Sequence, residues 1–263
     1  MLQFFKNIYS YRELLWALSL RELRIRYKQT LLGVAWAVIQ PLAMMFVFTL
    51  VFSKLRMVTI DDTGGFPYPI FSYCALVPWT FFSVTLTFAT RSIQTNMNLL
   101  MKIYFPREIF PLAKIMGGLI NYLIAMGVFL LMMIYYSISI HPTILIFPLI
   151  FLTQLFLMIG LSLILSAINV SFRDIGHAVQ LSMFLWLFAT PVSYPISKVP
   201  ESFLPWYRLN PMVGIIDSYR KVILEGEMPD MNIFGISIIG AVIVFIIGNI
   251  YFKRSEKRFA DII

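Results

Sequence analysis

Charged residues in this chain are confined to short segments that separate long charge-free stretches. The lengths of these stretches are 25, 28, 58, 23 and 22 residues, and their positions are 29–53, 63–90, 115–172, 175–197 and 231–252. One helix needs about 20 apolar residues to cross the hydrocarbon core of a bilayer. The pattern therefore predicts a chain that crosses a membrane several times.

The longest stretch is too long for one crossing, and His141-Pro142 is the expected break because proline disfavours a continued helix. The predicted fold is an all-α integral membrane protein with six transmembrane helices and both termini on one side. The expected spans are 32–53, 69–90, 115–136, 144–168, 176–195 and 232–252. We divide the chain into an N-terminal segment, 1–31, and one membrane domain, 32–263.

Composition excludes several classes of protein. Only 13% of the residues are charged and 59% are hydrophobic, whereas about 25% of the residues of a soluble domain are charged. The net charge of +8 is spread between apolar runs, which argues against a nucleic-acid-binding module. The single cysteine, Cys74, cannot form an intrachain disulfide or a cysteine-based metal site.

The distribution of Lys and Arg predicts the orientation. The segments on the side of both termini hold 15 of these residues and a net charge of +9, whereas the other side holds 6 and a net charge of −1. Because Lys and Arg are enriched in cytoplasmic loops, we expect both termini to be cytoplasmic.

The sequence contains few groups that could carry chemistry. No expected span has an Asp, Glu, Lys or Arg in its interior, which argues against transport driven by protons or sodium. No Gly-Lys pair exists, so the chain has no phosphate-binding loop of the GxxxxGK[S/T] type. His141 and His177 are too far apart to suggest a metal site. We expect no catalytic residue, no metal and no cofactor in this chain.

Segment 9–31 predicts an amphipathic helix at the membrane interface. Its apolar face and its basic face are formed by Trp16, Leu20, Leu23 and Tyr27, and by Arg21, Arg24 and Lys28. The alternative is a juxtamembrane helix that is merely held by anionic membrane lipids.

The loop 91–114 contains the unusually apolar run MKIYFPREIFP at 101–111. We expect a short helix with Pro106 at its first position, interrupted at Pro111. The apolar patch and its charged rim comprise Tyr104, Phe105, Ile109 and Phe110, with Lys102, Arg107 and Glu108. Such a patch is typical of a docking element, and packing against the bilayer interface is the alternative.

Four motifs resemble the membrane subunits of type-2 ABC exporters, in the branch that exports O-antigen, capsule and teichoic acid from bacteria. They are LLGVAWAVIQPL (31–42), MKIYFPREIFPLAK (101–114), VSFRDI (170–175) and KRSEKRFADII (253–263). The resemblance implies a homodimer in the bacterial inner membrane, paired with two ATPase subunits that bind ATP and magnesium. The implied cargo is a polysaccharide, expected to be lipid-linked.

The resemblance also implies that loop 91–114 carries a coupling helix for the ATPase. The implied coupling residues are Lys102, Ile103, Tyr104, Phe105, Pro106, Arg107, Glu108, Phe110, Phe172, Arg173 and Asp174. One alternative is an exporter of drugs or small molecules from the same superfamily. Another is a membrane-embedded sugar transferase, for which the cytoplasmic loops offer few acidic residues.

The loop 196–231 predicts two short helices. A first one is expected in 200–209, and Asn210-Pro211 is a typical start of a second, which Gly226 ends. Its apolar face and its polar face comprise Met212, Ile215, Ile216, Tyr219, Val222 and Ile223, and Asp217, Arg220 and Lys221. By resemblance this loop forms an external gate, and a structural cap is the alternative.

We expect two copies of the chain to enclose a channel in which aromatic rings stack on sugar faces. The candidate lining residues are Trp36, Phe46, Trp79 and Tyr194. The neutral polar residues of the spans are expected to form hydrogen bonds between helices. They are Gln40, Asn121, Gln154, Asn169 and Asn249.

Overall fold

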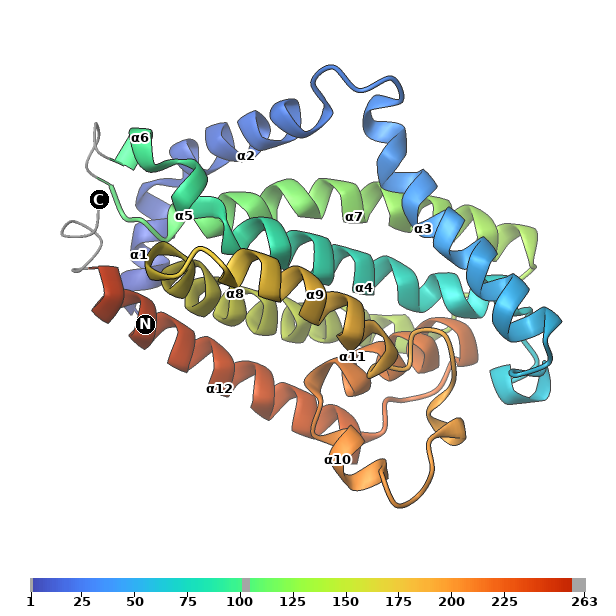
Figure 1. Ribbon diagram of the computed structural model, residues 1–263. Coiled ribbons are helices and arrows are strands. Elements are labelled where there is room, and N and C mark those ends of the chain that lie inside the picture. The colour runs from blue at the N-terminus through green and yellow to red at the C-terminus, as the bar shows by residue number, and fades with distance from the viewer. Residues whose placement is uncertain (1, 101–104, 257–263) are drawn as a thin grey trace.

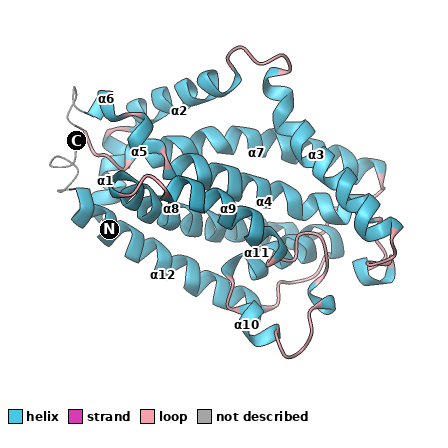
Figure 2. Cartoon of the chain, in the orientation of Figure 1, coloured by secondary structure: helices cyan, strands magenta, loops and turns pink. Residues whose placement is uncertain are grey.

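The computed structural model describes residues 2–100 and 105–256, and all regular structure in them is helical (Figure 2). The helices are α1 (Leu2–Ser10), α2 (Arg12–Tyr27), α3 (Trp36–Phe48), α4 (Tyr68–Thr90), α5 (Ser92–Thr95), α6 (Met97–Leu100), α7 (Ile109–Tyr135), α8 (Phe147–Ser171), α9 (Ile175–Phe188), α10 (Leu204–Arg208), α11 (Pro211–Arg220) and α12 (Met231–Glu256). The long helices run side by side in a bundle (Figure 1). The predicted all-α membrane fold is confirmed.

Both ends of the described chain lie at one end of the bundle, together with α1, α5 and α6 (Figure 1). We call this end the termini side. Helices α10 and α11 lie toward the other end, which we call the opposite side. The six crossings predicted from the charge pattern require this arrangement, because an even number of crossings returns the chain to its starting side.

Five helices in the described residues are long and apolar enough to cross a membrane. They are Gly33–Lys54, Tyr68–Thr90, Ile109–Tyr135, Pro142–Ser171 and Met231–Glu256. These correspond to five of the six predicted spans, although the third begins six residues earlier than expected. The first span contains α3 between a 3₁₀ turn and a π-helical turn.

The remaining predicted span, 176–195, is shorter than expected. Helix α9 has 14 residues and ends at Phe188, which gives a length of about 21 Å against a hydrocarbon core of about 30 Å. The chain turns at Thr190, whose carbonyl accepts a hydrogen bond from Val192 N at 2.7 Å. The predicted end at 195 was wrong because Pro191 lies in a turn that has no charged residue to mark it.

Helices α8 and α12 pack together through two glycines. A Cβ atom added to Gly160 would lie 2.6 Å from the backbone of Phe245, and one added to Gly248 would lie 2.4 Å from the Gly160 carbonyl oxygen. No other residue type fits at either position without moving a backbone. Small residues allow this close approach, which is typical of helix pairs in membranes.

Helix α4 is the centre of the bundle, with α3, α7, α8, α9 and α11 around it. A buried chain of hydrogen bonds joins it to its neighbours. Gln154 donates to the Pro78 carbonyl at 2.8 Å and accepts from the Tyr219 hydroxyl at 2.9 Å. The expectation that Gln154 bonds between helices is confirmed, as it is for Asn121 and Asn169.

The second helix of loop 196–231 forms as predicted. The Asn210 side chain accepts from Met212 N and caps α11, and Gly226 ends the following turn with a φ of +70°. The apolar face that was predicted from periodicity is buried throughout. The first helix of the loop is shorter than expected, since α10 covers only Leu204–Arg208.

Arg220 departs from its prediction, because it lies in the core rather than on the polar face of α11. Its side chain is 3% exposed. The guanidinium lies 3.7 Å from the centre of the Phe71 ring and donates to the carbonyls of Pro191 and Val192, the latter at 2.7 Å. Arg220 therefore fastens the turn after α9 to α4 and α11.

An ion pair joins the two loops of the opposite side. Lys198 Nζ lies 2.8 Å from Asp62 Oδ2. The hydrogen bond from Lys198, with further bonds from Thr59, lowers the pKa of Asp62 from 3.8 to about 2. A lowered pKa means that the contact stabilises the fold above pH 3.8 and is lost as the pH falls toward 2. It is fully present at neutral pH.

We predict that Arg220→Met lowers the free energy of unfolding by about 3 kcal/mol or more, because at least two buried carbonyls lose their donor at roughly 1–3 kcal/mol each. Arg220→Lys should lose less, since it keeps one donor. The free energy of unfolding is measured by titration with sodium dodecyl sulfate in mixed micelles. The control is Lys54→Met, which removes an exposed cation and should change stability by less than about 0.5 kcal/mol. Equal effects of the two Met variants would contradict the buried role of Arg220.

Candidate functional site

The N-terminal segment consists of two helices rather than the single predicted one. Helix α2 ends at Tyr27, and Gln29 follows with a left-handed φ of 62°. Leu23 of the predicted apolar face lies against Gly117 of α7, and Tyr27 bonds to the same helix, whereas Trp16 is exposed. The predicted basic face is exposed. The two predicted faces are therefore present, and Trp16 is the exception.

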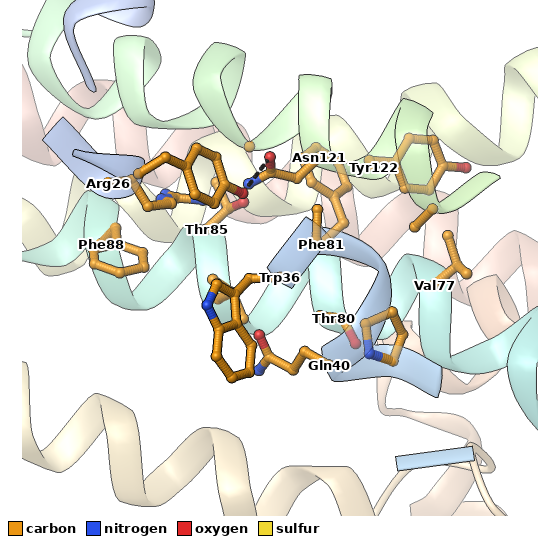
Figure 3. Close-up of a pocket in the computed structure, with 16 residues that line it drawn as sticks. Arg26, Trp36, Gln40, Val77, Thr80, Phe81, Thr85, Phe88, Asn121 and Tyr122 are labelled. Carbon is orange, nitrogen blue, oxygen red and sulfur yellow. Dashed lines mark hydrogen bonds between the residues drawn. The ribbon is translucent and has the colours of Figure 1, made fainter. Parts of the chain in front are cut away.

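A cavity of about 280 Å³ lies between α2, α3, α4 and α7. Figure 3 shows Arg26 and Phe88 at one end, Trp36 and Asn121 near the middle and Val77 at the other end. The Tyr27 hydroxyl donates to Asn121 Oδ1 at 2.7 Å and closes the wall between α2 and α7. Sequence patterning could not reveal this cavity, because its walls come from four separate segments.

The four candidate lining residues lie in different surroundings. Trp36 lines the cavity and is 47% exposed, and Phe46 is exposed on the same helix. Trp79 is 4% exposed and packs against Phe82 and Trp186, so it is a packing residue within one copy of the chain. Tyr194 donates its hydroxyl hydrogen to the Phe188 carbonyl at 2.6 Å. A role in lining a channel stays a prediction for all of them.

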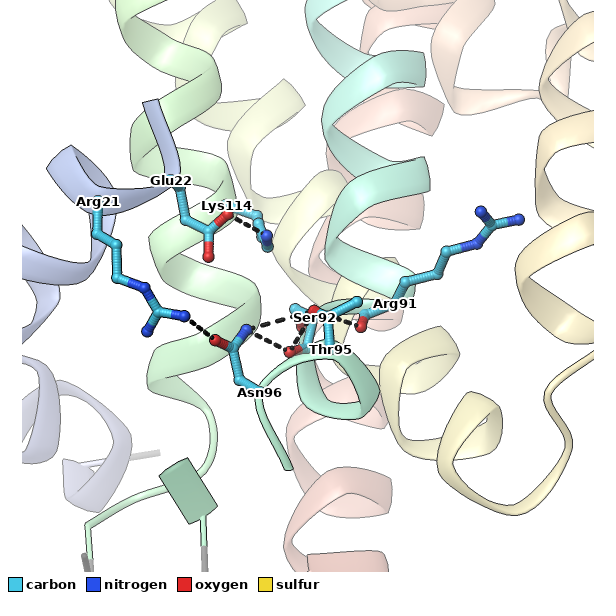
Figure 4. A network of polar contacts seen from close by, with 7 residues as sticks. All are labelled: Arg21, Glu22, Arg91, Ser92, Thr95, Asn96 and Lys114. Atoms are coloured by element: carbon cyan, nitrogen blue, oxygen red, sulfur yellow. Dashed lines mark hydrogen bonds and ion pairs between the residues drawn. The ribbon is translucent and has the colours of Figure 1, made fainter. Parts of the chain in front are cut away.

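A polar network attaches α2 to loop 91–114 on the termini side (Figure 4). Glu22 forms an ion pair with Lys114, and both side chains are almost fully buried. The neighbouring Arg21 donates to Asn96 Oδ1 at 3.0 Å, and Asn96 donates to the Ser92 carbonyl at 2.8 Å. The network therefore connects α2 with both α5 and α7.

The run 101–111 differs from its prediction in the part that the structure describes. Residues 105–108 are not helical, and α7 begins at Ile109 with Pro111 in its first turn. A proline there costs no hydrogen bond, since the first N–H groups of a helix have no partner within it. The predicted short helix that is interrupted at Pro111 was therefore wrong. Lys102, Ile103 and Tyr104 lie outside the described residues.

The apolar side chains of this run pack into the bundle. Phe105, Ile109 and Phe110 are all buried, and the rings of Phe105 and Phe110 lie 5.2 Å apart. The exposed patch that their composition suggested is absent from the described residues 105–110. Burial in the bundle matches neither the expected docking patch nor the alternative of packing against the bilayer interface, and contact of these residues with an ATPase stays a prediction.

The charged residues of the run are tied to both ends of the chain. Glu108 is 1% exposed, accepts from Asn7 at 2.9 Å and forms an ion pair with Lys253. The guanidinium of Arg107 donates to the Glu256 carbonyl at 2.8 Å. This part of the loop is thus held between α1 and α12.

The loop between α8 and α9 remains open to the termini side. Phe172 is 67% exposed, and Arg173 and Asp174 are exposed beside it. We call these three residues the exposed loop. Behind them, Asn169 donates to Gln94 Oε1 at 3.1 Å, so the loop is joined to the segment of α5.

The described residues hold no group of three or more His, Cys, Asp or Glu side chains that could bind a metal ion. Cys74 is buried, and so are its neighbours in α4. Glu22, Lys114 and Asn96 on the termini side are engaged in holding helices together.

Comparison with known proteins agrees with this architecture. Residues 13–224 match the family of ABC-2 type transporters. The chain is 31% identical over 260 residues to the O-antigen export system permease protein RfbA of Myxococcus xanthus, covering 98% of both chains. It is 27% identical to RfbA of Klebsiella pneumoniae, covering 95% of both chains. It is 24% identical to the polysialic acid transport protein KpsM of Escherichia coli, covering 81% of this chain and 82% of KpsM.

The family match spans most of the chain, and its apolar helices are those of a protein that crosses the membrane repeatedly. The chain is therefore a multi-pass membrane protein that belongs to the ABC-2 type transporter family.

Proposed function

We propose that this chain is the membrane subunit of an ATP-driven exporter that moves a lipid-linked polysaccharide across the bacterial inner membrane. The observation that carries the proposal is the similarity over nearly the whole chain to permeases of O-antigen export. The absence of ionisable residues from the predicted span interiors supports a motor outside this chain. Two copies of an ATPase subunit, which bind ATP and magnesium, would supply the energy.

The proposed assembly contains two copies of this chain around one channel. Exposed aromatic residues on α3 and α9 support it, namely Trp36, Phe46, Phe184 and Phe188. Both helices contact the central helix α4. In a dimer these rings would face the cargo or the second copy, and aromatic rings offer stacking surfaces for sugars without fixed charge.

Deleting the gene should abolish the surface polysaccharide of the cell and leave the polymer inside it. The wild-type gene should restore export. Extraction of surface and intracellular glycan, followed by electrophoresis, measures both pools. If surface glycan is unchanged while sensitivity to toxic small molecules rises, the exporter carries small molecules instead, and the polysaccharide assignment is wrong.

We also propose that the termini side faces the cytoplasm, as the excess of Lys and Arg there supports. The only cysteine, Cys74, is buried, so single introduced cysteines can be labelled against a silent background. Arg173→Cys should react with a membrane-impermeant maleimide only after the inner membrane is opened. Asp61→Cys on the opposite side should react once the outer surface of the inner membrane is accessible. The reverse pattern would invert the topology.

The exposed loop, Phe172 to Asp174, is the part of the termini side that we propose to contact the ATPase. Its three exposed side chains support this role, and its link to α5 provides a path into the bundle. ATP-driven closure of the partner would then move α5 and, through Arg21 and Glu22, helix α2. This is rigid-body switching between two states.

Arg173→Ala combined with Asp174→Ala should lower both the ATPase activity of the assembled complex and glycan export about tenfold, while the permease stays folded. Contacts that bridge two proteins through charged groups typically cost this much when removed. Co-purification of the ATPase and the thermal unfolding midpoint complete the measurement. Glu201→Ala, an exposed acidic residue on the opposite side, is the control and should change neither. Unchanged ATPase activity and export in the double variant would show that the ATPase contacts the permease at another place.

A further inference from the structure

The cavity between α2, α3, α4 and α7 has two chemically different ends. Phe88 lies two residues before the cytoplasmic end of α4, whereas Val77 lies eleven residues deeper in the same helix. This separation corresponds to about 16 Å along the helix axis, or roughly half of the hydrocarbon core. The cavity therefore extends from the level of the lipid headgroups to the middle of the membrane.

The headgroup end carries a cation without a paired carboxylate. The Arg26 guanidinium lies 4.4 Å from the centre of the Phe88 ring, and it forms no ion pair among the described residues. Glu22, one turn earlier in α2, pairs with Lys114 instead. A guanidinium has five N–H donors, so Arg26 can keep its contact with Tyr27 and still bind an anion.

The other polar groups of the cavity favour an anion as well. Asn121 Oδ1 accepts the Tyr27 hydroxyl hydrogen, so the amide N–H groups of Asn121 remain as donors. Trp36 contributes an indole N–H, and its ring is partly exposed. None of the residues that line the cavity is an Asp or a Glu. The headgroup end thus offers several donors and a positive charge, and no carboxylate lines the cavity.

The deep end is largely apolar. Pro41, Val77, Phe81 and Ala125 contribute to its walls. The whole cavity has a volume of about 280 Å³, which is at the lower limit of small-molecule pockets, about 300–1,000 Å³. It has room for one headgroup and the start of a chain, but not for several sugar units.

We propose that this cavity binds a lipid of the cytoplasmic leaflet through its phosphate group, with the phosphate at Arg26 and the start of the hydrocarbon chain beside Val77 and Ala125. Basic pockets between membrane helices bind lipid headgroups in this way. The shared chemistry is a phosphate ester on a lipid, which a membrane phospholipid or a polyprenyl diphosphate carrier could supply. With a membrane phospholipid as occupant the site is independent of the cargo proposed above, whereas with a polyprenyl diphosphate it rests on that proposed function.

The test uses the full-length protein in detergent, titrated with phosphatidylglycerol and with diacylglycerol, which has similar chains and no phosphate. Native mass spectrometry reports the bound lipid. Arg26→Gln should weaken phosphatidylglycerol binding about tenfold, as expected for one lost charge-assisted contact, and should leave diacylglycerol binding within about twofold. Arg26→Lys should retain most of the affinity. The matched control is Arg24→Gln, which removes an exposed arginine from the same helix.

Equal losses in Arg26→Gln and Arg24→Gln would overturn the proposal, because they would show a general attraction of lipid to a basic helix. Val84→Trp narrows the cavity without changing its charge and should weaken binding of both lipids. This variant keeps the proposal testable if Arg26→Gln does not fold, and unchanged binding in it would exclude the cavity. Displacement of lipid by an equal concentration of inorganic phosphate would overturn the assignment to a lipid.

A further titration with a polyprenyl diphosphate distinguishes the two kinds of phosphate lipid. A preference of about tenfold or more for the diphosphate lipid over phosphatidylglycerol would assign the site to a glycan carrier, whereas equal affinity would assign it to a membrane phospholipid. Both results support a phosphate-lipid site. Because the readout is lipid binding by purified protein, it is distinguishable from a failure of glycan export in cells.

Discussion

Close backbone approach is the interaction on which this bundle depends, because lipid leaves no hydrophobic driving force between helices. At Gly160 and Gly248, α8 and α12 come so near that a single methyl group would reach the neighbouring backbone. Packing and buried hydrogen bonds must then do what water exclusion does in a soluble protein. Gln154 provides such bonds, since it joins α8 to α4 and α11 at once. The deepest part of the structure is therefore held by uncharged groups.

Charged residues lie at the two ends of the bundle, and most of those described above form ion pairs or hydrogen bonds within the fold. On the termini side, Glu108 accepts from α1 and pairs with α12. On the opposite side, Arg220 donates to the carbonyls of the turn after α9. A buried guanidinium suits this position, since it offers five donors in a fixed plane and stacks on a ring. Among the charged residues that remain, Arg173 and Asp174 are exposed and Arg26 faces a cavity.

The spans, the membrane class and the capped start of α11 were predictable from sequence, because each depends on local patterns of charge, hydropathy and turn residues. The burial of Phe105 and Phe110 was not, since an apolar loop can face a partner protein or its own bundle with the same composition. Arg220 was placed on the polar face of its helix, because helical periodicity does not reveal carbonyls supplied by another segment. The family resemblance implied a set of coupling residues but could not distinguish the buried ones from the exposed ones.

Helix α2 connects the polar network of the termini side with the cavity that we propose to bind a lipid. Arg21 and Glu22 attach it to α5 and α7, and Arg26 lies one turn further along the same rigid helix. The distance between these attachments is about 7 Å along the helix axis. A shift of α5 must therefore either break the Arg21–Asn96 bond or move the cationic mouth of the cavity. The bond to Asn121 through Tyr27 opposes independent motion of that mouth, since it fixes the end of α2 to α7. The contacts of α2 therefore link the polar network of the termini side to the mouth of the cavity through one continuous helix.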